Sequence, residues 1–118
     1  RRMAAQGRGT IIFTGATASV RGGPNFASFA SAKHALRALA QSMARELGPL
    51  GVHVGHIIVD GMIDSEAVRS KFPEEAEALT DGGMLDPDHI AEAYWTMHAQ
   101  PKDAWTFEMD IRPSVERW

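Results

Sequence analysis

One stretch decides the fold of this chain: residues 29–48 read FASAKHALRALAQSMARELG. Apolar residues recur in it at spacings of three and four, which is the pattern of an amphipathic helix: Phe29, Ala32, Leu36, Leu39, Ala40, Met43 and Leu47. Gly48 and Pro49 are residues that end helices. The stretch therefore predicts one long helix with an apolar face that packs against another layer.

Two short apolar segments flank this helix. Ile11, Ile12 and Phe13 lie between Gly9 and Gly15, and residues 52–59 are rich in β-branched side chains. Both segments are typical of strands buried on both faces. A strand, a helix and a second strand form a βαβ unit, in which the strands are parallel and the crossover is right-handed.

The rest of the chain extends this α/β pattern. Short helices are expected over residues 65–71 and 74–79, and a longer one over 87–99, where Asp86 is the N-cap. Residues 107–111 alternate apolar and polar side chains, as a strand with one exposed face does. We therefore expect a single domain over residues 1–118, with about three parallel strands and helices on both faces.

The first residues predict something about what precedes them. Residues 1–7 read as the last turn of a helix, basic in character and stopped by Gly7. This is an unusual beginning for a domain. We therefore expect an upstream segment to be missing.

Composition excludes several classes of protein. The chain has 118 residues, with 12 Lys and Arg against 15 Asp and Glu, a net charge of -3. This balance excludes a strongly basic nucleic-acid binder. The absence of cysteine excludes disulfides, thiolate metal sites and a cysteine nucleophile. The apolar run at residues 57–59 is far shorter than the ~20 residues of a membrane span.

These observations favour a soluble, cytoplasmic protein with neither nucleic acid nor membrane as a partner. A metal site is not expected either. His53 and His56 are the closest pair of histidines, but residues three apart on a strand point to opposite faces.

Three parts of the sequence together resemble a known family. Residues 29–36, residues 43–48 and the Asp60-Gly61 pair that ends the second strand are similar to the C-terminal half of the short-chain dehydrogenases/reductases. The resemblance covers nearly the whole chain. It implies a partial Rossmann-like, doubly wound parallel sheet and an oxidoreductase that uses NAD or NADP.

The resemblance also assigns positions to the reactive groups. In that family the helix carries a Tyr-x-x-x-Lys pair, in which Tyr transfers a proton and Lys holds the cofactor ribose and lowers the Tyr pKa. Here the pair is Phe29 and Lys33, and Phe29 has no proton to give. The family's Ser position is Ala16, with Thr14 and Thr17 as the nearest hydroxyls.

A second family motif follows the next strand and holds the nicotinamide. The family has Pro-Gly-x-Val/Ile-x-Thr there, and residues 60–65 of this chain read DGMIDS. The resemblance implies that Gly61, Ile63 and Ser65, together with Lys33, are cofactor-binding residues. The Gly-x-Gly-x-x-Gly turn that cradles a dinucleotide pyrophosphate does not occur in this sequence. We therefore expect the chain to lack the Gly-rich half of the fold and to bind NAD or NADP poorly by itself.

Several of these residues have simpler interpretations. Lys33 is equally consistent with a solvated helix lysine, and Ser65 with the N-cap of the next helix. Asp60 and Asp64 flank the loop and are candidates to replace the missing proton-transfer group, although an Asp-Gly pair is also common in turns.

Two functional hypotheses follow. The first is a short-chain dehydrogenase/reductase-like protein that is inactive or impaired as this chain, because Phe29 and Ala16 stand at the catalytic positions. The alternative is a non-catalytic association module. Under either hypothesis we expect a homo-oligomer, formed through the 29–47 helix or through the open edge of the strand at 10–15, or a complex with a separate fragment that supplies the missing half. The strand at 10–15 carries no charge or proline to protect its edge.

Overall fold

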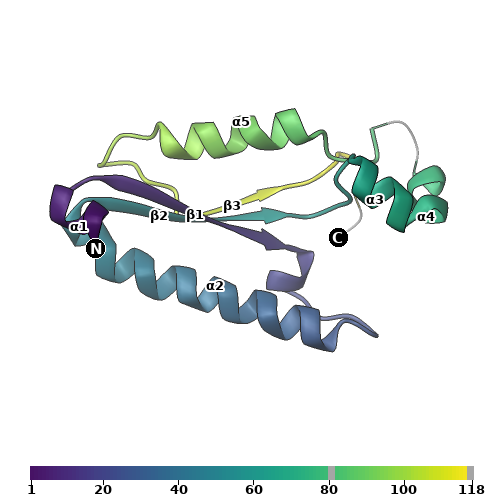
Figure 1. The fold of residues 1–118 in the computed structure, drawn as a ribbon, viewed down its shortest axis with the longest axis horizontal. Helices are drawn as coiled ribbons and strands as arrows, with labels where there is room; N and C mark the ends of the chain where they lie inside the picture. The colour runs from purple at the N-terminus through teal and green to yellow at the C-terminus, as the bar shows by residue number, and fades with distance from the viewer. Residues whose placement is uncertain (80–81, 117–118) are drawn as a thin grey trace.

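The fold is a three-stranded parallel sheet between two long helices, seen in a computed structural model that describes residues 1–79 and 82–116. The strands are β1 (Gly9–Ala16), β2 (Val52–Val59) and β3 (Glu108–Ile111), in that order across the sheet. Helix α2 (Ala27–Leu47) covers one face and α5 (Pro87–His98) the other (Figure 1). The predicted α/β class and the helices on both faces are confirmed.

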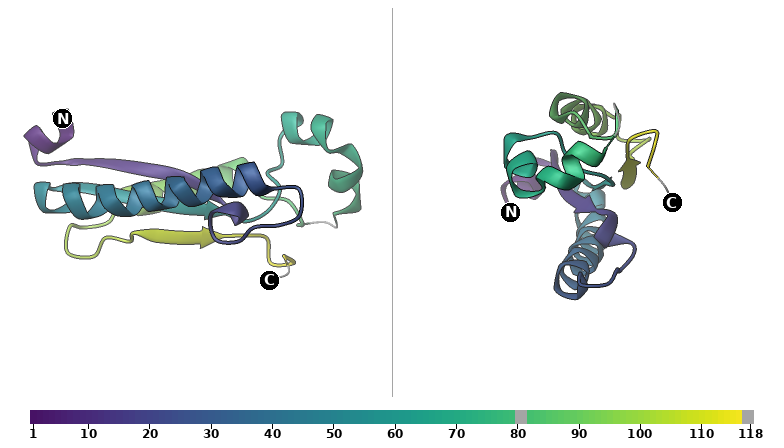
Figure 2. Two further views of the ribbon diagram at one scale, coloured as in Figure 1. Left: turned by 90° about the horizontal axis from the view of Figure 1, so that it is seen from below. Right: turned by 90° about the vertical axis from the view of Figure 1, so that its right-hand side faces the viewer.

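The shorter elements lie at the two ends of the sheet. Helix α1 (Arg2–Gln6) precedes β1, whereas α3 (Glu66–Lys71) and α4 (Pro73–Ala78) project beyond the carboxyl ends of the strands (Figure 2). Two 3-10 turns, η1 (Thr17–Ser19) and η2 (Gly48–Leu50), follow β1 and α2. This arrangement gives an elongated molecule of 48 × 29 × 24 Å.

Strand β2 is the centre of the sheet. It pairs in parallel with β1 from Gly9↔Val52 to Ala16↔Val59, and its last four residues pair with β3. All eight of its residues are buried, because it has a strand on each side and a helix over each face. The near-continuous apolar character of residues 52–59 is what such a position requires.

The core lies between the sheet and α5. Ile57, Val59 and Met97 form its buried centre, and Ile12 and Tyr94 pack against it. Gly55 is essential to this packing, because a Cβ at that position would overlap the Met97 sulfur. Because Gly55 has no side chain, α5 can pack close to the sheet at this point.

A polar network holds α2 to the other face. Arg37 donates two hydrogen bonds to the Glu108 carboxylate, at 2.7 and 2.8 Å, and Glu108 Oε2 lies 3.0 Å from Nδ1 of the fully buried His56. The opposite side of the imidazole lies against Gly15, where any Cβ would overlap Nε2. His53 has different partners, the Thr106 carbonyl and the stacked ring of Trp105.

This network makes the stability of the fold depend on pH. The hydrogen bonds from Arg37 lower the pKa of the Glu108 carboxyl, and His56 lowers it further. Because the folded-state pKa lies below the unfolded value, the stabilisation is present above the unfolded pKa and is lost as the pH falls through the folded pKa.

We predict that Arg37→Met destabilises the fold by roughly 1 to 2 kcal/mol at neutral pH, because two charge-assisted hydrogen bonds are lost at a partly exposed site. The difference from wild type should shrink as the pH falls, since wild type then loses the same stabilisation. Urea unfolding over a series of pH values measures this, with Arg45→Met on the exposed side of α2 as the control. A destabilisation that does not vary with pH would contradict the role of Glu108.

Candidate functional site

A cavity of about 640 Å³ opens at the carboxyl ends of β1 and β2. Ala16 and Val59, the last residues of these strands, form its floor with Gly61. The loop after η1 and the start of α2 contribute Arg21, Phe26 and Phe29. The far wall is made by Lys71 and Phe72, together with Met62. Open α/β sheets bind ligands in the crevice outside the carboxyl ends of their strands, and this cavity has that position.

Phe29 and Lys33 lie side by side on α2, as their spacing of four predicts. The Lys33 ammonium is 5.8 Å from the centre of the Phe29 ring and donates a hydrogen bond of 3.1 Å to the carbonyl oxygen of Thr14. Phe29 and Ala16 both line the cavity, so the two positions that the sequence resemblance makes reactive meet at one place. Lys33 is not among the residues that line the cavity.

The three residues after β2 that the sequence resemblance implies as cofactor-binding lie in different environments. Gly61 lines the cavity, and its φ of 151° is a conformation that favours glycine. Ile63 forms a bridge with Leu85 and packs against the core. Ser65 is the N-cap of α3 and accepts a hydrogen bond from the Val68 amide at 3.3 Å. The structure thus brings Gly61 to Phe29 and Ala16, and gives Ile63 and Ser65 structural contacts.

Asp60 is the most connected side chain beside the cavity. It is 5% exposed and accepts a hydrogen bond from the Thr17 hydroxyl. Two guanidinium groups approach it, with Arg112 Nη1 at 3.4 Å from Oδ2 and Arg21 Nη2 at 3.7 Å from Oδ1. Sequence reasoning treated Asp60 as part of a turn or as a proton-transfer candidate and did not identify these partners. The sequence signal for this buried role is a charged residue directly after the apolar run at residues 57–59.

Asp64 has a different environment. It makes a bidentate, exposed ion pair with Arg69, at 2.6 and 2.8 Å, on the other side of the same loop. The Arg69 hydrogen bonds lower the pKa of the Asp64 carboxyl. Asp60 and Asp64 therefore both have arginine partners.

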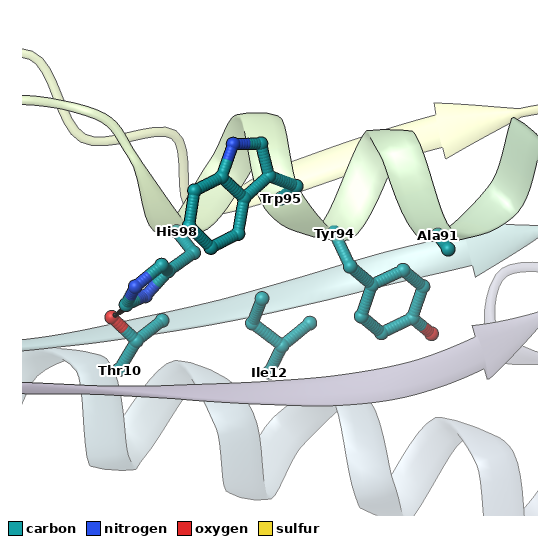
Figure 3. Close-up of a pocket in the computed structure, with 6 residues that line it drawn as sticks. All are labelled: Thr10, Ile12, Ala91, Tyr94, Trp95 and His98. Carbon is teal, nitrogen blue, oxygen red and sulfur yellow. Dashed lines mark hydrogen bonds between the residues drawn. The ribbon is translucent and has the colours of Figure 1, made fainter.

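A second, more open hollow of about 380 Å³ lies between β1 and α5 (Figure 3). Ile12 points from the strand toward the helix, and Tyr94 and His98 point from the helix toward the strand. Tyr94 Oη is 2.6 Å from the Thr14 hydroxyl, and His98 Nδ1 is 2.9 Å from that of Thr10. Trp95 stands over the rim and is 68% exposed.

Within residues 1–79 and 82–116, no three His, Asp or Glu side chains gather in a way that would hold a metal ion. In the same part of the chain, no helix has both the length and the apolar character needed to cross a bilayer.

Comparison with known proteins identifies the family. Residues 1–76 match the family model described as short chain dehydrogenase. The chain is 38% identical over 103 residues to "Short-chain dehydrogenase reductase 4" of Arabidopsis thaliana, an alignment that covers 79% of this chain and 34% of that protein. The chain belongs to the short-chain dehydrogenase family.

Solved structures agree with this assignment. A crystal structure of a short-chain dehydrogenase from Rhodopseudomonas palustris is 50% identical, with a TM-score of 0.70 over 94% of this chain and 41% of that one. The closed form of serine dehydrogenase complexed with NADP+ has a TM-score of 0.84 at 19% identity, which shows the shared fold. It is matched over 98% of this chain and 48% of its own length. The chain thus spans about a third of the curated relative and less than half of these structures.

We predict that Asp60→Ala lowers the free energy of unfolding by roughly 3 kcal/mol, because it leaves Arg112 beneath the surface without this carboxylate. Asp64→Ala is the matched control, since it removes a carboxylate from the same loop whose partner is exposed, and its loss should be markedly smaller. Urea unfolding at neutral pH compares the two. Equal losses would show that the Asp60 cluster does not hold the loop.

Proposed function

We propose that this chain forms the substrate side of an NAD(P)-linked short-chain dehydrogenase fold and that it is inactive or impaired as an oxidoreductase by itself. One observation carries the proposal. The side chains at the cavity positions that the family resemblance makes reactive are a phenyl ring and a methyl group, Phe29 and Ala16. Neither can donate or accept a proton, so the cavity can surround a substrate without the usual acid and base.

The Thr17 hydroxyl does not replace these groups. Thr17 lines the cavity, but its hydroxyl proton is donated to Asp60. Asp60 in turn is paired with Arg112 and Arg21. This arrangement favours a role in holding the cavity wall over a role as general acid.

The residues present fit one end of a nicotinamide dinucleotide. Val59, Gly61 and Met62 form a largely apolar part of the cavity lining, against which a nicotinamide ring can pack, and Lys33 lies next to the lining residue Phe29. When bound there, the nicotinamide carries the hydride. The only Gly-x-Gly in the chain is Gly7-Arg8-Gly9, at the amino end of β1 and away from the cavity. These residues do not fit the pyrophosphate.

We predict no NAD(P)-dependent oxidation of secondary alcohols by the 118-residue chain above the rate without enzyme. Positioned acid and base groups typically contribute about 10² to 10⁴ in rate, and this cavity holds neither. The absorbance of the reduced nicotinamide follows the reaction, and nicotinamide fluorescence on titration reports cofactor binding separately. Measurable turnover by this chain would overturn the proposal.

Placing a tyrosine at position 29 tests whether activity is limited first by cofactor binding or by the missing proton donor. We predict that Phe29→Tyr alone produces no turnover, because the dinucleotide still lacks a pyrophosphate cradle. Ala16→Ser combined with Phe29→Tyr is the companion variant, since it restores both hydroxyls at the cavity floor. Robust activity of the single variant would mean that this chain binds the cofactor productively, contrary to our account.

A second candidate function, association with another copy of the chain, is favoured by the outer edge of β1. In the described sheet β1 pairs with β2 alone, so its other edge presents unpaired backbone groups beside the apolar hollow of Figure 3. Exposed edges and apolar patches of this kind promote pairing between chains. We propose that a second copy covers this face.

Sedimentation analysis at micromolar concentration tests the association. We expect a species heavier than the 12.8 kDa monomer. Ile12→Lys and Trp95→Lys should shift it toward the monomer, because both place a charge on the face beside the β1 edge, whereas Leu50→Lys, at an exposed apolar residue in η2, should not. A single monomeric wild-type species, or an assembly that survives both changes, would exclude this face as the interface.

A further inference from the structure

We propose that the cavity at the ends of β1 and β2 binds a carboxylate carried on an apolar body of aromatic size, and that Arg21 is the residue that binds the carboxylate. The inference rests on the proposed function, because it assigns a substrate class to the same cavity. It concerns binding only and involves no chemical step.

The apolar part of the site is built from aromatic rings that remain exposed. Phe26, Phe29 and Phe72 all line the cavity and are 57%, 45% and 40% exposed. Phe26 and Phe29 form a tilted pair with ring centres 6.5 Å apart. Three phenyl rings exposed around one hollow are costly in water and are typical of a surface that a ligand covers.

The charges at the cavity have one sign. Arg21 and Lys71 are its charged lining residues, and no carboxylate lies among the described residues that line it. Asp60 is beneath the wall, where it is 5% exposed and contacts Arg112 and Thr17 as well as Arg21. A ligand in the cavity therefore meets two cations and an apolar wall, which is complementary to an amphipathic anion.

Arg21 has an ion-pair partner, but its hydrogen-bond donors are not used by any of the described residues. Its Nη2 is 3.7 Å from Asp60 Oδ1, which is an ion pair longer than a hydrogen bond, and its side chain is 46% exposed. Over the described residues the guanidinium makes no hydrogen bond, so all five of its N–H donors remain for a ligand or water. Arg112 differs, because it is 15% exposed and also pairs with Asp110.

The donor set matches a carboxylate. A guanidinium presents a planar fork that matches the two oxygens of a carboxylate, so one arginine can bind it with two hydrogen bonds. Lys71 adds a second positive charge from α3, with its ammonium 5.4 Å from the centre of the Phe72 ring. The cavity volume of about 640 Å³ is within the range of small-molecule sites and accommodates a phenyl ring with a short chain.

Two probes of matched shape test this assignment in the 118-residue chain. Phenylbutyrate carries the carboxylate, and phenylbutanol has the same apolar body without the charge. Isothermal titration and chemical-shift changes of backbone amides measure their affinities and locate the site. We expect phenylbutyrate to bind at least tenfold more tightly, a difference of about 1.4 kcal/mol. The amides of residues 16–29 should shift.

Variants identify the group responsible. Arg21→Gln should reduce the preference for phenylbutyrate to less than threefold while leaving phenylbutanol unchanged, and Lys71→Gln should reduce it in part. Arg45→Gln is the matched control, because it removes one positive charge from the exposed side of α2 and should leave the preference intact. Phe26→Ala should weaken both probes, since it removes part of the apolar wall.

Three results would overturn the proposal: equal affinities for the two probes, a preference that survives Arg21→Gln, or no binding of phenylbutyrate at millimolar concentration. None of them depends on NAD or NADP. If the 118-residue chain oxidises secondary alcohols with NAD or NADP and also discriminates between the probes, the proposed function is wrong and this assignment stands. If it shows no such turnover and does not bind phenylbutyrate, the reverse holds.

Discussion

The parallel pairing of β2 with a strand on each side is the constraint on which the rest of the structure depends. Because β1 and β2 run in the same direction and are in register through Ala16↔Val59, their carboxyl ends stop at one edge of the sheet. The chain then has to leave both strands at the same place. The loops that follow them, and the first turn of α2, are thereby brought together around a single cavity.

Asp60 connects the three segments that meet there. It directly follows β2, Thr17 belongs to η1 after β1, and Arg112 directly follows β3. A buried carboxylate is tolerable only when it is paired, and here its partners come from each of the neighbouring strand ends. One side chain thus fixes how three loops leave the sheet, and it positions Arg21 above the cavity through a weaker contact.

Membership of the family and the chemistry of the cavity must be considered separately. The chain belongs to the short-chain dehydrogenase family and has a βαβ unit, and it spans only part of the relatives it matches. At the positions that the sequence resemblance makes reactive, this chain has the Phe29 ring and the Ala16 methyl. Under the proposed function these two side chains take no part in proton transfer and belong to the apolar wall, which is consistent with a site that binds more readily than it reacts.

The sequence by itself determined the fold. Helical spacing in residues 29–47, the β-branched run at 52–59 and the Asp86-Pro87 cap are local signals, and each produced the element it predicted within about two residues. The side-by-side placement of Phe29 and Lys33 also followed from their spacing, because an α-helix brings residues four apart to one face.

Only the tertiary structure decided which distant side chains meet. The contacts Arg37–Glu108, Thr17–Asp60 and Asp60–Arg112 join residues far apart in the chain, and neither composition nor periodicity contains that information. The same holds for the phenyl rings of Phe26 and Phe72, which reach one cavity from two separate segments. Local sequence sets the backbone of each element, whereas the register of the sheet and the packing of the helices on it set the partners, because residues far apart in the chain meet only in the folded structure.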